Sequence, residues 1–138
     1  MSLKSGKSNL SKVKYRSGLE ERLAKALGRK YLYEPYAIPY IVKRKYTPDF
    51  VYHESKVLIE AKGFFRVGDT QKYTSIRDSI KEDGWELVFV FSDPKKKLRK
   101  GSKMTLGQWC DKEGFAYFTE ESCSDMMEYI QCLQLTKN

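Results

Sequence analysis

The chain has 138 residues, enough for one domain, and 41% of them are hydrophobic, so a substantial core can be buried. No apolar run approaches the roughly 20 residues of a membrane span, so we expect no membrane association. The net charge of +8 is uneven: residues 1–103 carry 24 basic and 12 acidic side chains, whereas residues 104–138 carry 2 and 6. A basic body of this kind is typical of proteins that bind nucleic acid.

The cysteines and the single histidine restrict the redox and metal chemistry. Cys110, Cys123 and Cys132 are odd in number and lack metal-type spacing. One histidine excludes a His-rich metal site, and His53 is predicted to be a surface turn residue. The N-terminus has no apolar signal region. Together these features predict reduced thiols in an intracellular protein.

The first two segments are a basic arm and a helix. Residues 1–15 carry four lysines and no acids, and we expect them to be flexible until they meet DNA phosphates, although a merely solubilising terminus fits as well. A helix is predicted over residues 17–28, where Ser17 is a good N-cap and Glu20 completes a capping box. The residues alone therefore favour a capping role for Glu20.

Residues 31–42 are rich in aromatic and branched side chains but contain two prolines, Pro35 and Pro39. Proline cannot donate a hydrogen bond to a neighbouring strand. This segment is therefore predicted to be an edge strand or an extended crossing segment. The basic run Lys43-Arg44-Lys45 follows it directly.

A β-hairpin is predicted over residues 46–63, with the polar residues 53–56 as its turn. Folded symmetrically, this hairpin places Asp49 directly opposite Glu60. Opposed residues have Cβ atoms roughly 5 Å apart on the same face, and Lys62, two residues after Glu60, shares that face. Two carboxylates and one ammonium group are thus expected to converge.

This convergence has a chemical use. Paired carboxylates suit a hard cation such as Mg²⁺, which takes one or two of them together with water and phosphate oxygens. Such an ion can polarise a phosphodiester, and Lys62 can position the water or stabilise the charge that builds on the phosphate. A structural Lys62–Glu60 ion pair at the end of the sheet is the other interpretation.

The rest of the chain is predicted to complete an α/β sheet. Residues 57–59 are continuously apolar, which is typical of a central strand covered on both faces. A helix and a buried strand after them indicate a β-α-β crossover to a parallel neighbour. The predicted elements are a helix over 70–83, a strand over 86–92, a short helix over 105–114 with Trp109 in the core, a strand over 115–118, and an acidic helix over about 120–135 capped by Thr119.

A lysine-rich loop is predicted at the carboxyl end of the strand over 86–92, where open α/β sheets commonly bind ligands. Its basic residues are Lys95, Lys96, Lys97, Arg99, Lys100 and Lys103. Charge runs are often only solvated, but the density and position of this one favour contact with a DNA backbone.

Three sequence blocks carry a family resemblance. Pro48-Asp49, ten residues and then Glu60-Ala61-Lys62 resemble the PD-(D/E)xK nuclease signature, which is weak by itself. Arg16-Ser-Gly-Leu-Glu20 lies upstream, and the order and spacing of the blocks resemble phage endonuclease I, the Holliday-junction resolvase family of T-seven-type bacteriophages. The likeness covers roughly residues 10–118, and a Lys-Leu-x-Lys-Gly-Ser block of the lysine-rich loop is also similar to one in the family.

The resemblance implies a restriction-endonuclease-like PD-(D/E)xK core, with a mixed β-sheet flanked by helices and an intertwined dimer that exchanges N-terminal segments. It implies that Glu20 is an active-site carboxylate, which would support a second metal ion, and that the Ala61 carbonyl adds a ligand. The expected organisation is one nuclease domain over 1–138: a flexible basic arm (1–15), the nuclease core (16–118) and a C-terminal acidic helix (119–138).

The sequence thus predicts a metal-dependent endodeoxyribonuclease that resolves four-way junctions and branched DNA as a homodimer, in the cytoplasm of a bacterial or phage-infected cell. The expected catalytic residues are Glu20, Asp49, Glu60 and Lys62, with Mg²⁺, or Mn²⁺ as a substitute, at one or two ions per site on Asp49, Glu60, Ala61 and Glu20. The residues expected to contact DNA are Lys12, Lys14, Arg16, Lys43, Arg44, Lys45, Arg66, Lys72, Lys95, Lys96, Lys97, Arg99, Lys100 and Lys103.

Two other functions are open at this point. The same hairpin chemistry serves nucleases that cut linear duplexes, such as transposon-end, repair and restriction enzymes. The absence of an obvious base-reading module favours recognition of shape instead. A non-catalytic DNA-binding protein would explain the basic charge, but it has no need of converging carboxylates.

Overall fold

A computed structural model of the chain describes residues 13–137. Lys12 and most of the predicted basic arm lie outside the described residues. The chain divides into two compact units, of which the first ends at Arg44 and the second begins at Lys45.

The first unit holds helix α1 (Gly18–Leu27) and an extended segment that follows it. The Ser17 hydroxyl accepts a hydrogen bond from the Glu20 backbone N–H at 3.2 Å, so Ser17 is the N-cap that the sequence predicts. Gly28 ends the helix with a positive φ of 87°. Residues 31–45 contain no strand, which agrees with the extended alternative for this proline-interrupted segment.

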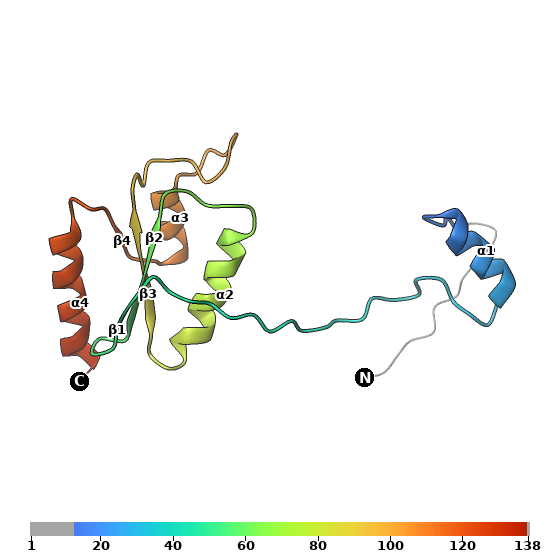
Figure 1. Ribbon diagram of the computed structural model, residues 1–138, viewed down its shortest axis with the longest axis horizontal. Coiled ribbons are helices and arrows are strands. Elements are labelled where there is room, and N and C mark those ends of the chain that lie inside the picture. Colours follow the sequence, from blue (N-terminus) through green and yellow to red (C-terminus); the bar gives the residue numbers. More distant parts are fainter. Residues whose placement is uncertain (1–12, 138) are drawn as a thin grey trace. The chain divides into compact units, whose positions relative to one another are not determined.

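The second unit is a four-stranded mixed sheet flanked by helices, as predicted from the sequence (Figure 1). Strand β1 (Phe50–Tyr52) pairs antiparallel with β2 (Val57–Lys62), and β2 pairs parallel with β3 (Glu86–Phe91), which pairs parallel with β4 (Tyr117–Phe118). Helix α2 (Asp69–Lys81) connects β2 to β3, which confirms the predicted crossover. Helices α3 (Leu106–Glu113) and α4 (Cys123–Lys137) complete the unit.

Strand β3 divides the core into two layers because its side chains alternate between the faces of the sheet. Leu87, Phe89 and Phe91 pack with α2 and α3 residues, including Tyr73 and Trp109. Val88 packs on the other face with Val57 of β2 and with Met126 and Ile130 of α4. In Figure 1 the sheet accordingly lies between α4 on one side and α2 and α3 on the other.

Several boundaries differ from the sequence prediction, and strand β4, for example, begins at Tyr117 and not at residue 115. Thr119 does not cap α4: its backbone N–H donates to the Ser122 hydroxyl at 2.8 Å, and this local turn delays the start of the helix to Cys123. Strand β1 is short because pairing begins only at Phe50. Within residues 13–137, no helix is both long and apolar enough to cross a membrane.

Candidate active site

The β1–β2 hairpin has the predicted register. Phe50 pairs with Ile59, Val51 with Leu58, and Tyr52 with Val57, and residues 53–56 form the turn. One further step along this register places Asp49 opposite Glu60, just beyond the end of β1. Both side chains therefore point to the sheet face that α2 covers, as does Lys62 at the end of β2.

Asp49 is tied to the neighbouring strand through its side chain. Its Oδ2 atom accepts a hydrogen bond of 2.8 Å from the backbone N–H of Ala61. The N–H and C=O groups of one strand residue point to the same edge, so the Ala61 carbonyl also points toward the Asp49 side of β2. An exposed carboxylate and a backbone carbonyl are thus presented side by side.

Among residues 13–137, Glu60 is the one buried charged residue, with 7% of its surface exposed. Tyr46 donates a hydrogen bond of 2.6 Å to Oε2, and Tyr73 of α2 donates one of 3.0 Å to Oε1. Burial raises the pKa of both tyrosines, and the negative charge of Glu60 raises it further. Both hydroxyls therefore stay protonated and keep donating to the carboxylate at neutral pH.

Lys62 lies between two carboxylates. Its Nζ atom is 4.0 Å from Oε1 of Glu60 and 3.9 Å from Oδ2 of Asp69. Asp69, the first residue of α2, is held in turn by the backbone N–H of Arg66 at 2.8 Å. The ammonium group is only partly exposed, and these contacts fix it beside the Asp49–Glu60 pair.

The donor set fits a hard cation better than a transition metal. Among residues 13–137, no three His, Cys, Asp or Glu side chains lie close enough to form a ready-made metal cage. Magnesium does not require one, because it binds through one or two carboxylates and completes its shell with water and phosphate oxygens. Asp49, the Ala61 carbonyl and Glu60 provide oxygen ligands of this kind.

Glu20, the fourth predicted catalytic residue, belongs to the first unit, so its place at this site stays a prediction. Its carboxylate accepts hydrogen bonds from the hydroxyls of Ser17, at 2.9 Å, and Tyr33, at 2.6 Å. Both bonds lower the pKa of Glu20, and the bond from Tyr33 has the larger effect. Only half of the expected capping box therefore forms, because the carboxylate binds side-chain hydroxyls and not the Ser17 backbone N–H.

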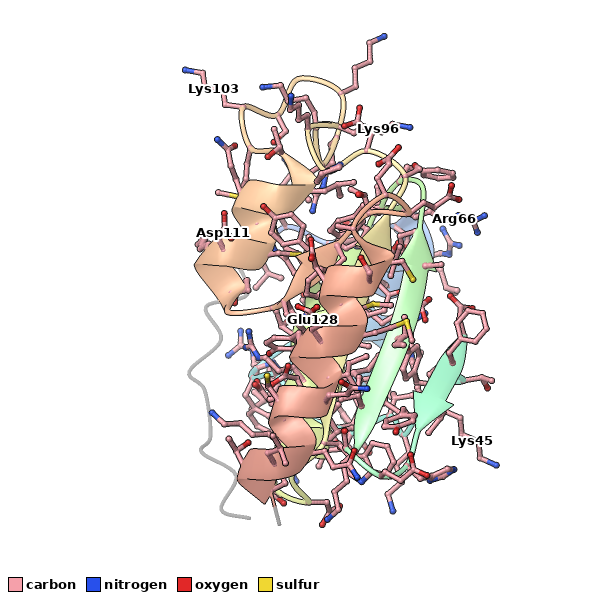
Figure 2. The ribbon with its side chains drawn as sticks, turned by 90° about the vertical axis from the view of Figure 1, so that its left-hand side faces the viewer. Lys45, Arg66, Lys96, Lys103, Asp111 and Glu128 are labelled. Atoms are coloured by element: carbon pink, nitrogen blue, oxygen red, sulfur yellow. The ribbon has the colours of Figure 1, made fainter. Side chains whose placement is uncertain are left out.

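The lysine-rich loop between β3 and α3 has a defined conformation. The backbone N–H of Leu98 donates to the Met104 carbonyl at 3.0 Å, and that of Leu106 donates to the Lys96 carbonyl at 2.9 Å. Within the described part of the chain, the basic side chains of this loop form no salt bridge. Figure 2 shows Lys96 and Lys103 projecting at one end of the unit, beyond the sheet.

The other residues expected to contact DNA fall into two groups. Lys72 lies near the carboxylates, because its ammonium is 5.6 and 5.3 Å from the ring centroids of Tyr46 and Tyr73, and Arg66 lies in the loop after β2. Lys45 begins the second unit. The first unit contains four described residues of this set, Lys14, Arg16, Lys43 and Arg44. Of these, Arg16 forms a salt bridge of 3.4 Å with Glu34.

Comparison with known proteins identifies the family. The model of the family described as phage endonuclease I matches residues 1–125, nine-tenths of the chain. The chain belongs to the phage endonuclease I family. Among curated members, Endodeoxyribonuclease 1 of Enterobacteria phage T3 is 38% identical over 109 residues, which are 75% of this chain and 70% of that protein. Endonuclease I of Escherichia phage T7 is 35% identical over 109 residues, which are 75% of this chain and 71% of the T7 protein.

The part that matches the phage endonuclease I family contains all four predicted catalytic residues, whereas most of α4 lies beyond it. Sequence reasoning missed Tyr46, Tyr73 and Asp69, which hold Glu60 and Lys62 in place. Tyr46 stands directly before the Thr-Pro-Asp block, and Asp69 directly follows a glycine at the start of a helix. Neither position signals its role until α2 is packed against the sheet.

Proposed function

We propose that this protein is a metal-dependent, structure-selective endodeoxyribonuclease that resolves four-way junctions and branched DNA by paired phosphodiester hydrolysis. The observation that carries the proposal is the hairpin register, which brings Asp49 opposite Glu60 with Lys62 on the same face. The names of its T3 and T7 relatives support the reaction, since both are endonucleases. The phage origin of these relatives supports action inside an infected host cell.

The residues of the site have separable roles in this hydrolysis. Asp49, Glu60 and the Ala61 carbonyl would hold Mg²⁺, with Mn²⁺ as the expected substitute, and the bound ion would supply Lewis acidity toward the phosphodiester. Lys62 lies beside Glu60, where it positions the attacking water or stabilises the negative charge that grows on the phosphate oxygens. Glu20 is the residue that would support a second ion.

A homodimer with exchanged N-terminal segments would place two such sites on one junction. The apolar stripe of α1 supports it: Leu19, Leu23 and Leu27 are 66%, 52% and 43% exposed, and no residue of α1 is buried. An exposed apolar stripe on a helix indicates a packing surface, which a helix exchanged between chains would use. The extended segment after α1 also exposes Tyr40 and Ile41.

Cleavage of a synthetic four-way junction, beside a linear duplex of the same sequence, tests the proposal. We expect paired nicks near the branch point with Mg²⁺, none with EDTA, and little cutting of the linear duplex. Glu60→Gln should abolish cleavage and retain most junction binding, because it removes a metal ligand and leaves the basic loop intact.

Other outcomes would redirect the assignment. Cutting of the linear duplex at defined positions would indicate a nuclease of the transposon-end, repair or restriction type. Tight binding without any product, under any divalent ion, would indicate a DNA-binding protein. Cleavage by Glu60→Gln at the wild-type rate would show that the carboxylate pair is not the catalytic site.

A further inference from the structure

Phe64 is an exposed aromatic residue beside the candidate active site, and none of the roles described above uses it. It follows Lys62 by two residues, and 52% of its surface is exposed, whereas its neighbour Phe65 is 7% exposed and belongs to the core. Successive side chains of extended backbone point to opposite sides, so burying Phe65 turns Phe64 outward. The fold gains little from a phenyl ring in this position.

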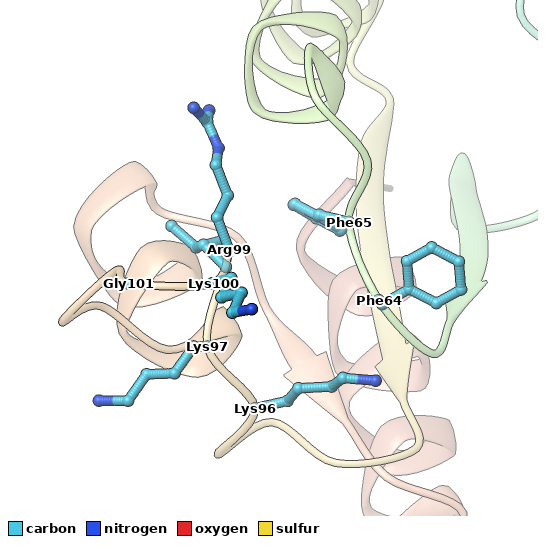
Figure 3. Close-up of a pocket in the computed structure, with 8 residues that line it drawn as sticks. Phe64, Phe65, Lys96, Lys97, Arg99, Lys100 and Gly101 are labelled. Atoms are coloured by element: carbon cyan, nitrogen blue, oxygen red, sulfur yellow. The ribbon is translucent and has the colours of Figure 1, made fainter.

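A hollow of about 450 Å³ lies between the Phe64–Phe65 segment and the lysine-rich loop (Figure 3). The loop lines it with Lys96, Lys97, Leu98, Arg99, Lys100 and Gly101. Small-molecule sites span roughly 300–1,000 Å³, so this volume suits a group the size of one nucleotide.

Cations surround the Phe64 ring. The Lys96 ammonium lies 5.5 Å from the ring centroid and the Arg66 guanidinium carbon 5.9 Å from it, and Figure 3 shows Lys96 reaching across from the loop toward the segment that carries Phe64. An aromatic face with cationic neighbours is the arrangement that single-stranded nucleic acid uses, with bases on the rings and phosphates on the cations. The charge complements an anionic ligand.

We propose that Phe64 stacks on a nucleobase that branched DNA exposes next to the cleaved phosphate, while Lys96 and Arg66 bind the adjoining phosphates. This inference rests on the proposed function and adds a specificity-determining residue to it. Two residues of backbone span at most about 7 Å, so Phe64 lies within one nucleotide of the group that Lys62 serves. A continuous linear duplex stacks both faces of every internal base pair, whereas stacking is interrupted where the arms of a junction meet, so the contact favours branched substrates.

Affinity measurements with Phe64→Ala test this proposal on the full-length protein in EDTA, where cleavage is prevented. We expect Phe64→Ala to bind the four-way junction about 5- to 100-fold more weakly, the range of one base–aromatic stack, and to bind the linear duplex as the wild type does. Phe64→Trp should bind the junction about as tightly as the wild type, because it keeps an aromatic ring at this position. Val67→Ala is the matched control, since Val67 lies in the same loop and is 88% exposed.

Abasic substitutions identify the base. Replacing one nucleotide at a time near the cleaved phosphate with an abasic site should reveal a position that weakens wild-type binding as much as Phe64→Ala does. At that position the two losses should not add, because they remove the same contact. Because Phe64 is exposed, we expect the melting temperature of the variant to stay near that of the wild type.

Different measurements contradict the role of Phe64 and the proposed nuclease function. If Phe64→Ala binds the junction as tightly as the wild type, or loses equal affinity for the linear duplex, Phe64 does not read an exposed base, whether or not the protein cleaves junctions. Additive losses at every abasic position would overturn it as well. A wild-type protein that neither binds nor cuts the junction selectively would overturn the proposed function itself.

Discussion

Tyr73 donates a hydrogen bond of 3.0 Å from its hydroxyl to Oε1 of Glu60. The bond joins the aromatic core to the candidate site, because the Tyr73 ring packs edge-on against Phe89 with their centroids 5.0 Å apart. Together with Tyr46, which binds the other carboxylate oxygen, it fixes the position of Glu60 before any metal or DNA arrives. The position of the Glu60 carboxylate is therefore set by the core.

The double variant Tyr46→Phe/Tyr73→Phe should weaken Mn²⁺ binding, measured by calorimetry, by about 10- to 100-fold, as is usual when residues that hold a metal ligand are lost. Each hydroxyl donates to a charged group, so each single variant should also lower the free energy of unfolding by about 1.5–3 kcal/mol.

Tyr129→Phe provides the matched control for that variant. Tyr129 also donates to a carboxylate, that of Glu86, but it does so from α4 on the other side of the sheet. We expect Tyr129→Phe to lower the free energy of unfolding about as much as each single variant does, and to leave the Mn²⁺ affinity unchanged. Equal effects of the two changes on Mn²⁺ binding would show that general destabilisation, and not the position of Glu60, is responsible.

Glu20→Gln should distinguish a capping residue from a catalytic one. We expect cleavage to be abolished while the free energy of unfolding changes by about 1 kcal/mol or less, because Gln has nearly the size of Glu and its amide oxygen still accepts a hydrogen bond at this half-buried site. The bonds from Tyr33 and Ser17 that lower its pKa keep the carboxylate ionised at neutral pH. Ser17→Ala, which removes the N-cap and one of these bonds, should cost about 1 kcal/mol. It should lower the cleavage rate far less than Glu20→Gln, because the carboxylate and its bond from Tyr33 remain. Wild-type cleavage by Glu20→Gln would limit Glu20 to the cap.

Replacing Lys95, Lys100 and Lys103 together by alanine should weaken binding to every DNA and flatten its salt dependence. Each phosphate contact contributes about −0.9 to the slope of log K against log salt. The slope of the triple variant should therefore be less steep than that of the wild type by about 3. Lys112→Ala on α3, which removes an exposed lysine outside the loop, should leave the slope unchanged. An unchanged slope for the triple variant would mean that the loop is only solvated.

Cys110 should be unreactive in the native protein. It is fully buried, and burial raises the pKa of its thiol to about 12, so little thiolate forms near pH 8. A thiol reagent at that pH should titrate the exposed Cys123 and Cys132 rapidly and the third cysteine only after unfolding. Three rapid thiols would contradict the packing of α3 against the sheet.

The same burial predicts a loss of stability at alkaline pH. Cys110, Tyr46 and Tyr73 have raised pKa values in the folded state, so the folded protein retains protons that the unfolded chain releases. The free energy of unfolding should therefore decrease as the pH rises above about 9, the usual range of these groups. Urea titrations between pH 7 and pH 10 measure it.

The sequence by itself determined the elements and the hairpin, because short-range patterns govern them. The polar residues 53–56 between two β-prone runs fix the turn, and the turn fixes the register that opposes Asp49 to Glu60. The unbroken apolar run of residues 57–59 marked β2 as a strand covered on both faces, and both layers of the core contact it. Local signals misplaced only boundaries, as at Thr119, where a side chain accepts the backbone N–H before the helix begins.

Only the tertiary structure decided which groups hold the site. Tyr73 and Asp69 come from α2, and they meet Glu60 and Lys62 because the crossover returns the helix over the sheet face that carries the carboxylates. The exposure of Phe64 follows from the burial of Phe65, which no local pattern specifies because both residues are phenylalanine. Contacts between segments distant in sequence depend on packing, and packing is a property of the whole sheet and its helices.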